Sequence, residues 1–145
     1  MNQLSWRCPL GVAAFFCMAG AAQAADVTVR VAGPLEVKGV VGCALFAGAR
    51  GFPMDNSGAR MMWLPVQAQG VTCAFRYIPG GTYAVSVLQD LNGNQVVDTN
   101  VSGMPQEPWG VSNNVRPTLR PPRFDETAFN VDENQGRDVQ IRVAP

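Results

Sequence analysis

The chain has 145 residues, with 11 basic and 11 acidic side chains, four cysteines and no histidine. This balance of charge predicts neither a nucleic-acid interface nor a polybasic patch for anionic lipid. Without histidine, the chain has no means of building a Ser-His-Asp or Cys-His catalytic set, or a histidine-ligated zinc site, of its own.

Residues 1–24 have the three parts of a secretion signal. Arg7 gives a basic start, and residues 9–22 form an apolar run shorter than the roughly 20 residues that span a bilayer. A small-x-small pattern, which signal peptidase accepts, ends at Ala24. We expect cleavage after Ala24, which leaves residues 25–145 as a mature protein in the periplasm or outside the cell.

Two other fates of this segment fit the sequence less well, namely retention as a membrane anchor and lipidation at Cys8 or Cys17. The apolar run is short for an anchor. Arg7 and Phe16 stand just before the two cysteines, where lipoprotein processing requires a small residue. We therefore expect no transmembrane anchor after cleavage.

Residues 25–145 amount to one domain, which is long enough to bury a core. Loss of Arg7 leaves a formal charge of −1, and only Cys43 and Cys73 remain of the four cysteines. An even count in an oxidising compartment favours a Cys43–Cys73 disulfide, and the alternation of the sequence places both side chains on inward faces. The alternative is two buried free thiols that act as small hydrophobic side chains.

Period-two alternation of apolar and polar residues recurs along the mature chain, whereas sustained helical periodicity does not. About seven short strands are expected, separated by Gly, Pro and Asn turn signals. This spacing favours an all-β fold, an antiparallel β-sandwich. The expected strands cover residues 27–31, 40–47, 61–66, 71–78, 82–89, 127–131 and 139–143.

Three of these segments carry a further signal. Residues 40–47 are apolar or small on both faces, as expected of a central strand. Pro65 removes a hydrogen-bond donor from the strand at 61–66, which favours a sheet edge. The Pro-Gly-Gly turn between the strands at 71–78 and 82–89 favours a hairpin.

Residues 90–123 are rich in Gly, Pro and Asn and show no sustained alternation. A connection of this length within a compact domain is usually functional or disordered. Met104, Trp109 and Leu119 are expected to anchor it against the sandwich. We therefore expect one long, packed, irregular loop.

This loop opens with an oxygen-rich pattern, D-x-N-x-N-x-x-x-D, which resembles the start of a calcium-binding loop. The candidate metal ligands are Asp90, Asn92, Asn94 and Asp98. Gln95 stands where such a loop has glycine and Val101 where it has a bidentate glutamate, so any Ca²⁺ site would be weak. The alternative is that the Asn and Asp side chains cap turns by bonding their own backbone, with no cofactor.

Five motifs occur here in an order that resembles one bacterial family. They are Gly51-Phe52-Pro53, residues 79–85, residues 90–94 with 98–100, residues 109–114, and residues 121–125. The family is the domain-of-unknown-function family DUF2141. The resemblance implies exported proteins with a prealbumin-like (transthyretin-like) or carboxypeptidase-regulatory-like sandwich, and it carries over no catalytic residues. The chain departs from the family pattern at Gln89, where histidine is common, and at Gln95, where glycine is common.

Three functions are compatible with these observations. The first is a non-enzymatic envelope module that binds a small ligand or an envelope protein through residues 90–123. The second is a purely structural domain stabilised by weak Ca²⁺ binding between Asp90 and Asp98. The third is a hydrolase on a transthyretin-like scaffold, but that activity relies on histidines, which this chain lacks. We expect the first, and no enzyme.

Overall fold

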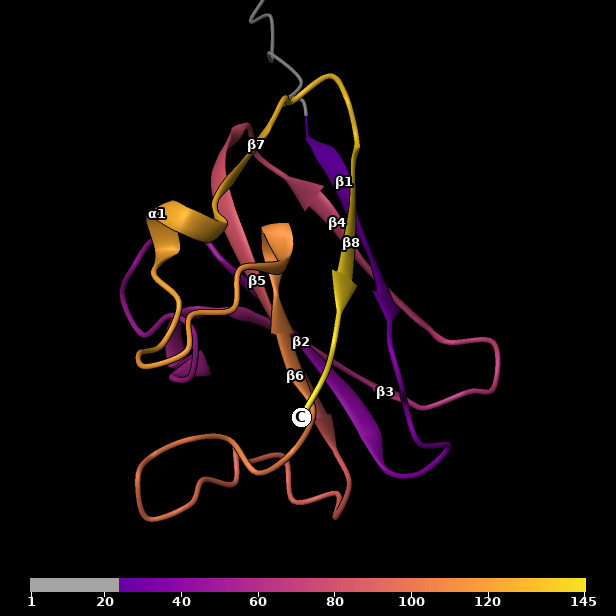
Figure 1. The fold of residues 1–145 in the computed structure, drawn as a ribbon. Coiled ribbons are helices and arrows are strands. Elements are labelled where there is room, and N and C mark those ends of the chain that lie inside the picture. The colour runs from indigo at the N-terminus through magenta and orange to yellow at the C-terminus, as the bar shows by residue number, and fades with distance from the viewer. Residues whose placement is uncertain (1–23) are drawn as a thin grey trace, which may run out of the picture.

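The computed structural model describes residues 24–145, so the expected signal peptide at residues 1–24 lies outside the described residues apart from Ala24. Within the described part, none of the helices is long and apolar enough to cross a membrane. The strands form two sheets, and the elements between them are short (Figure 1). In chain order they are β1 Ala25–Ala32, β2 Val40–Phe46, η1 Asn56–Gly58, β3 Arg60–Pro65, β4 Val71–Ile78, β5 Gly81–Asp90, β6 Trp109–Val111, η2 Ser112–Asn114, α1 Phe124–Thr127, β7 Phe129–Val131 and β8 Arg137–Arg142.

The three-stranded sheet has the order β4-β1-β8. The alternation in β1 works as expected, because Val27 and Val29 are fully buried while Arg30 is exposed. β1 pairs with β4 in the antiparallel sense but with β8 in the parallel sense. The expectation of a purely antiparallel sandwich is therefore corrected at this pair, since alternation fixes which face of a strand is buried but not the direction of its neighbour.

The five-stranded sheet has the order β3-β2-β5-β6, and β7 pairs with the beginning of β5. β2 lies between β3 and β5, which confirms the central strand expected at residues 40–47. β3 ends at Pro65 and forms the edge of the sheet, as the missing N–H of proline predicts.

The hairpin expected between β4 and β5 is wrong, because these two strands belong to different sheets. Tyr77 adopts a positive φ of 57°, and Pro79 and Gly80 carry the chain from one sheet to the other. The residues on either side of the turn have different partners, since Ile78 pairs with Ala25 and Gly81 with Val131. A turn does lie at residues 79–80, but it connects the two layers of the sandwich.

The inward faces of the two sheets form the core. It is built mainly from valines of both sheets, joined by Phe75, Ile78 and Ile141. A disulfide links Cys43 of β2 with Cys73 of β4, with a Cα–Cα distance of 6.5 Å. The predicted all-β, two-sheet architecture and the predicted disulfide are both confirmed, and the disulfide connects the two layers.

The segment expected as one long irregular loop, residues 90–123, contains β6 and η2. The described part of the chain therefore has eight strands rather than seven. Residues 124–127 form the short helix α1, so the strand expected at 127–131 begins only at Phe129. Leu119 is 95% exposed and does not anchor the segment, whereas Trp109 is half-buried.

Candidate functional site

The first predicted ligand, Asp90, lies at the end of β5 and is fully buried. Its Oδ1 accepts the backbone N–H of Gly93 at 2.6 Å and of Asn94 at 3.3 Å, and its Oδ2 accepts that of Gln95 at 2.6 Å. Gln95 has a positive φ of 59°, a left-handed backbone conformation that favours glycine. Asp90 thus closes a tight turn with both of its carboxylate oxygens.

The other three predicted ligands lie close together in the same turn. Asn92 Nδ2 donates to the carboxylate of Asp98 at 2.6 Å, and Asn94 Nδ2 donates to the same carboxylate at 3.2 Å. The side-chain oxygens of Asn92 and Asn94 each accept a backbone N–H two residues further on, at 2.9 Å. The structure therefore brings the four residues together, and their hydrogen bonds are those of successive Asx-turns.

A buried carboxylate that the spacing did not reveal lies beside this turn. Glu107 is 6% exposed, its Oε1 accepts the backbone N–H of Leu91 at 2.7 Å, and its Oε2 has no hydrogen-bond partner. Burial, and to a lesser degree the charges of Asp90 and Asp98, raise the pKa of Glu107 above its usual value. Among residues 24–145, no three Asp, Glu or Cys side chains form a cluster able to hold a metal.

A second candidate site is a hollow on the outer face of the five-stranded sheet. Its floor consists of two cross-strand rows that run over β3, β2, β5 and β6. One row is Trp63, Gly42, Leu88 and Trp109, and the other is Met61, Ala44, Ser86 and Val111. Large side chains at both ends and small ones on β2 leave a trough in the middle.

Gly42 makes the close packing of this floor possible. A Cβ atom added at Gly42 would lie 2.4 Å from Cζ3 of Trp63, well inside van der Waals contact. The indole ring therefore covers the glycine from the neighbouring strand. A side chain at this position would displace the wall of the hollow.

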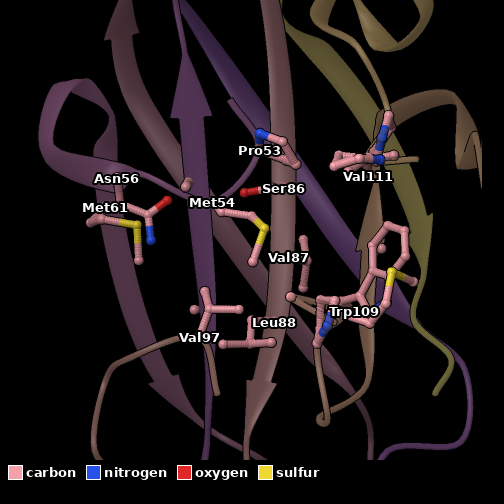
Figure 2. Close-up of a pocket in the computed structure, with 18 of the residues that line it drawn as sticks. Pro53, Met54, Asn56, Met61, Ser86, Val87, Leu88, Val97, Trp109 and Val111 are labelled. Carbon is pink, nitrogen blue, oxygen red and sulfur yellow. The ribbon is translucent and has the colours of Figure 1, made fainter. Parts of the chain in front are cut away.

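Three connections form the rim of the hollow, which has a volume of about 60 Å³ (Figure 2). Pro53, Met54 and Asn56 come from the connection between β2 and β3, and Arg120, Pro121 and Pro122 from the segment before α1. The connection between β5 and β6 supplies Val97, Gly103, Met104 and Pro105. Figure 2 shows the thioether of Met54 lying over the strands of the floor, with Val97 beside Leu88.

The lining of the hollow is mostly apolar, with Asn56, Ser86 and Arg120 as its polar side chains. Arg120 is already engaged, because its guanidinium forms two hydrogen bonds with Glu126, at 3.0 and 2.6 Å. This ion pair, aided by the backbone N–H of Arg123, lowers the pKa of Glu126 to about 2. Asn56 differs, because its Oδ1 is buried and has no hydrogen-bond partner.

Comparison with known proteins places the chain in a bacterial family. The model of the family described as "Uncharacterized protein conserved in bacteria (DUF2141)" matches residues 29–140, which is most of the chain. The protein belongs to the DUF2141 family. No match was found among curated proteins, and none among solved structures. The matched residues include both rows of the floor and the whole segment from Asp90 to Arg123.

Sequence reasoning about this DUF2141 protein did not find the hollow. The signal was present as small residues at Gly42 and Ala44, two apart on β2, facing the large residues Met61 and Trp63, two apart on β3. It becomes visible only once the register of the two strands is known. Asn56 and Glu107 carry no such signal, because burial without a partner depends on tertiary packing.

Proposed function

We propose that this protein is an exported, non-enzymatic module that binds a small apolar ligand in the hollow over β3, β2, β5 and β6. One observation carries the proposal: two rows of outward-facing side chains build an apolar trough where an outer sheet face normally meets solvent. Apolar hollows with few polar groups are the usual form of small-ligand sites.

Two further features support a binding role. Residues of the 90–123 segment, including Val97, Met104 and Trp109, line the hollow, so the long connection contributes to the site. Met54, Met61 and Met104 also line it, and methionine side chains adapt to ligands of different shape. The polar lining residues Asn56, Ser86 and Arg120 include no acid-base pair, which favours binding over catalysis.

The two tryptophans of the expected mature chain, Trp63 and Trp109, both line the hollow, so their fluorescence reports on its occupancy. We expect titration with toluene, as a simple apolar probe, to change the emission with saturation. Ala44→Leu fills the floor from β2 and should abolish this response. Fluorescence titration of both proteins, with calorimetry as a second readout, measures the effect.

The matched control is Ala74→Leu, which adds the same side chain to a half-buried position on the outer face of β4, in the other sheet. This variant should respond to toluene as the unmodified protein does. An emission that does not saturate, or a response that survives Ala44→Leu, would show that the hollow is not a binding site.

Export to the periplasm is the second part of the proposal. The apolar run and small-x-small pattern of residues 1–24, together with a disulfide between the sheets, favour an oxidising compartment outside the cytoplasm. Mass spectrometry of the periplasmic fraction of an expressing bacterium should find a chain that begins at Ala25. A full-length chain in the membrane fraction would contradict cleavage.

A structural role with weak Ca²⁺ binding is the second candidate function. The observation that favours it is Glu107, a buried carboxylate whose Oε2 has no hydrogen-bond partner. Burial raises its pKa, and the charges of Asp90 and Asp98 raise it further. A Ca²⁺ ion held by the oxygens of the Asp90–Asp98 turn would lower the negative charge that Glu107 meets. Such an ion would stabilise the connection that forms part of the rim of the hollow.

A further inference from the structure

The connection between β5 and β6 contains the sequence Asp98-Thr99-Asn100-Val101-Ser102, which ligand binding in the hollow does not explain. Its last three residues match N-x-S/T with x other than proline, the acceptor sequence for N-linked glycosylation in exported proteins. Asp98 adds an acidic residue two positions before the asparagine, as bacterial oligosaccharyltransferases require. No other asparagine of the chain is followed at this spacing by serine or threonine. Asn100 is therefore the candidate acceptor.

The acceptor sequence lies in a small hairpin on the surface of the molecule. Thr99 and Pro105 form an antiparallel bridge, and residues 99–104 between them are exposed. Val101 is fully exposed, and a Cβ atom added at Gly103 would meet no other atom within 4 Å. Figure 1 shows that the connection between β5 and β6 extends beyond the end of β5. The tip of the hairpin thus has free space around it for a large polar group.

The hydrogen bonds of the Asn100 side chain leave its nitrogen available. Its Oδ1 accepts the backbone N–H of Ser102 at 2.9 Å and of Met104 at 3.1 Å. Only the oxygen of an amide side chain accepts hydrogen bonds, so these two donors distinguish Oδ1 from Nδ2. Among residues 24–145, neither Nδ2 of Asn100 nor the hydroxyl of Ser102 makes a hydrogen bond. The atom that would carry a sugar is exposed and unpaired.

A transferase has to draw the acceptor sequence out of this hairpin, and the hairpin is held only by short-range contacts. The backbone N–H of Gly103 donates to the carbonyl of Asn100, and that of Gln106 to the carbonyl of Asp98, each at 2.8 Å. None of residues 98–104 belongs to the buried core. Exposed segments with few buried contacts open at a small fraction of the free energy of global unfolding. The folded protein can therefore present the acceptor sequence.

Resting on the export proposed above, and on no ligand in the hollow, we propose that Asn100 is a site of N-linked glycosylation. The donor is an oligosaccharide joined to a lipid through pyrophosphate. A bond forms between Nδ2 of Asn100 and the anomeric carbon of the first sugar. The bond from that carbon to the pyrophosphate oxygen breaks, and the lipid pyrophosphate leaves with the electron pair. The amide gives one proton to a base of the transferase, which recognises Asp98 and the hydroxyl of Ser102.

The test is transfer of the glycan to the purified, disulfide-bonded protein by a bacterial oligosaccharyltransferase with its lipid-linked oligosaccharide. We expect intact-mass spectrometry to find one added glycan per chain, and peptide fragmentation to place it on Asn100. Asn100→Gln and Ser102→Ala should each abolish the addition, because the first moves the amide nitrogen and the second removes the hydroxyl. Ser102→Thr keeps a hydroxyl and should retain the glycan.

Asn134→Gln is the matched control. Asn134 is an exposed asparagine in another turn, with Asp132 two positions before it but Gly136 where the acceptor sequence has serine or threonine. This variant should receive the glycan as the unmodified protein does. A reference acceptor peptide in the same reaction shows that the transferase is active.

An unmodified chain in a reaction that modifies the reference peptide, or a glycan that persists in Asn100→Gln, would overturn the site. Because the reaction uses purified protein, its result does not depend on export. A glycan transferred to a chain that is found uncleaved in the membrane fraction would overturn export alone. A glycosylated chain that does not respond to toluene would overturn ligand binding in the hollow and leave the site at Asn100 standing.

Discussion

At the scale of single residues, Asp90, a predicted metal ligand, fixes the backbone of residues 93–95 by hydrogen bonds. It is fully buried, and its two carboxylate oxygens accept three backbone N–H groups. Asp90→Asn replaces one acceptor oxygen by an amide donor that faces another donor. We expect a loss of about 1–3 kcal/mol in the free energy of unfolding, measured by urea denaturation without added calcium.

The control for this prediction is Asp132→Asn. Asp132 accepts the backbone N–H of Asn134 at 2.8 Å in an exposed turn, so its replacement should change stability by less than about 0.5 kcal/mol. Equal denaturation midpoints for Asp90→Asn and the unmodified protein would show that the three hydrogen bonds contribute nothing.

Glu107 gives a prediction with a defined pH dependence. Its pKa is raised in the folded protein, chiefly by burial, so the folded state binds this proton more tightly than the unfolded state does. Stability therefore decreases as the pH rises from the ordinary glutamate value through the raised one. Glu107→Gln keeps an acceptor for the N–H of Leu91 without the charge. We expect the variant to be more stable at pH 7 and to lose this advantage at about pH 3, where the carboxyl is protonated in both states.

Denaturation midpoints of both proteins at the two pH values test this expectation. The control is Glu133→Gln, which changes an exposed acid near β7 and should leave both midpoints unchanged. An unmodified protein that is the more stable of the two at pH 7 would indicate that the charge of Glu107 is stabilising there.

At the scale of elements, the sequence predicted the strands well and their partners poorly. The inward valines of β1 and the proline at the end of β3 depend on local rules, and both predictions are confirmed. The pairing of β4 and β5 was predicted wrongly, because a Pro-Gly turn serves a hairpin and a crossing between sheets equally well. β6 was missed because three residues are too short to show alternation.

The Asn113-Asn114 pair that follows β6 has a structural role that only the structure shows. Asn113 and Asn114 both have positive φ, at 60° and 53°. Asn113 Nδ2 donates to the carbonyl of Ala128 before β7, and Asn114 bonds the carbonyl of Gln140 and the N–H of Arg142 in β8. Their hydrogen bonds connect η2 with the start of β7 and with β8. Nothing in the spacing of the two residues in the sequence indicates these partners.

The turn at residues 90–98 is the element on which the calcium prediction depends. Its Asx-turns are complete without an ion. A bound Ca²⁺ would therefore have to replace the hydrogen bonds that the amides of Asn92 and Asn94 donate to the carboxylate of Asp98. We expect any Ca²⁺ binding at this turn to be weak. At ten times the dissociation constant, the gain in unfolding free energy would be about 1.4 kcal/mol, with less for magnesium.

Thermal unfolding with and without 10 mM calcium chloride, a concentration on the order of ten times a millimolar dissociation constant, measures this gain. Asp98→Asn should abolish the shift, and Asp125→Asn, at an exposed acid in α1, should preserve it. If calcium leaves the melting curve of the unmodified protein in place and calorimetry shows no heat, the turn is held by hydrogen bonds alone.

At the scale of the whole molecule, the two sheets have different structural roles. The three-stranded sheet covers one side of the core. Its paired residues point alternately inward and outward, as the alternation of apolar and polar residues in the sequence predicts. The five-stranded sheet is covered on both sides, by the core within and by three connections without (Figure 1). The candidate site therefore depends on the outer face of one layer, which stays in place only if the layers keep their relative position.

The Cys43–Cys73 disulfide is the covalent link between these layers, and its removal should destabilise the fold. The bridge closes a loop with a sequence separation of 30, for which the chain-entropy model gives about 3.5 kcal/mol of stabilisation. Replacing both cysteines by alanine should lower the unfolding free energy by about this amount and increase the denaturant slope, because the unfolded chain becomes less compact. The unmodified protein under reducing conditions should behave in the same way, which separates loss of the bridge from loss of two buried side chains. Two reactive thiols per unfolded chain from the periplasm, or a midpoint that reductant does not move, would contradict the prediction.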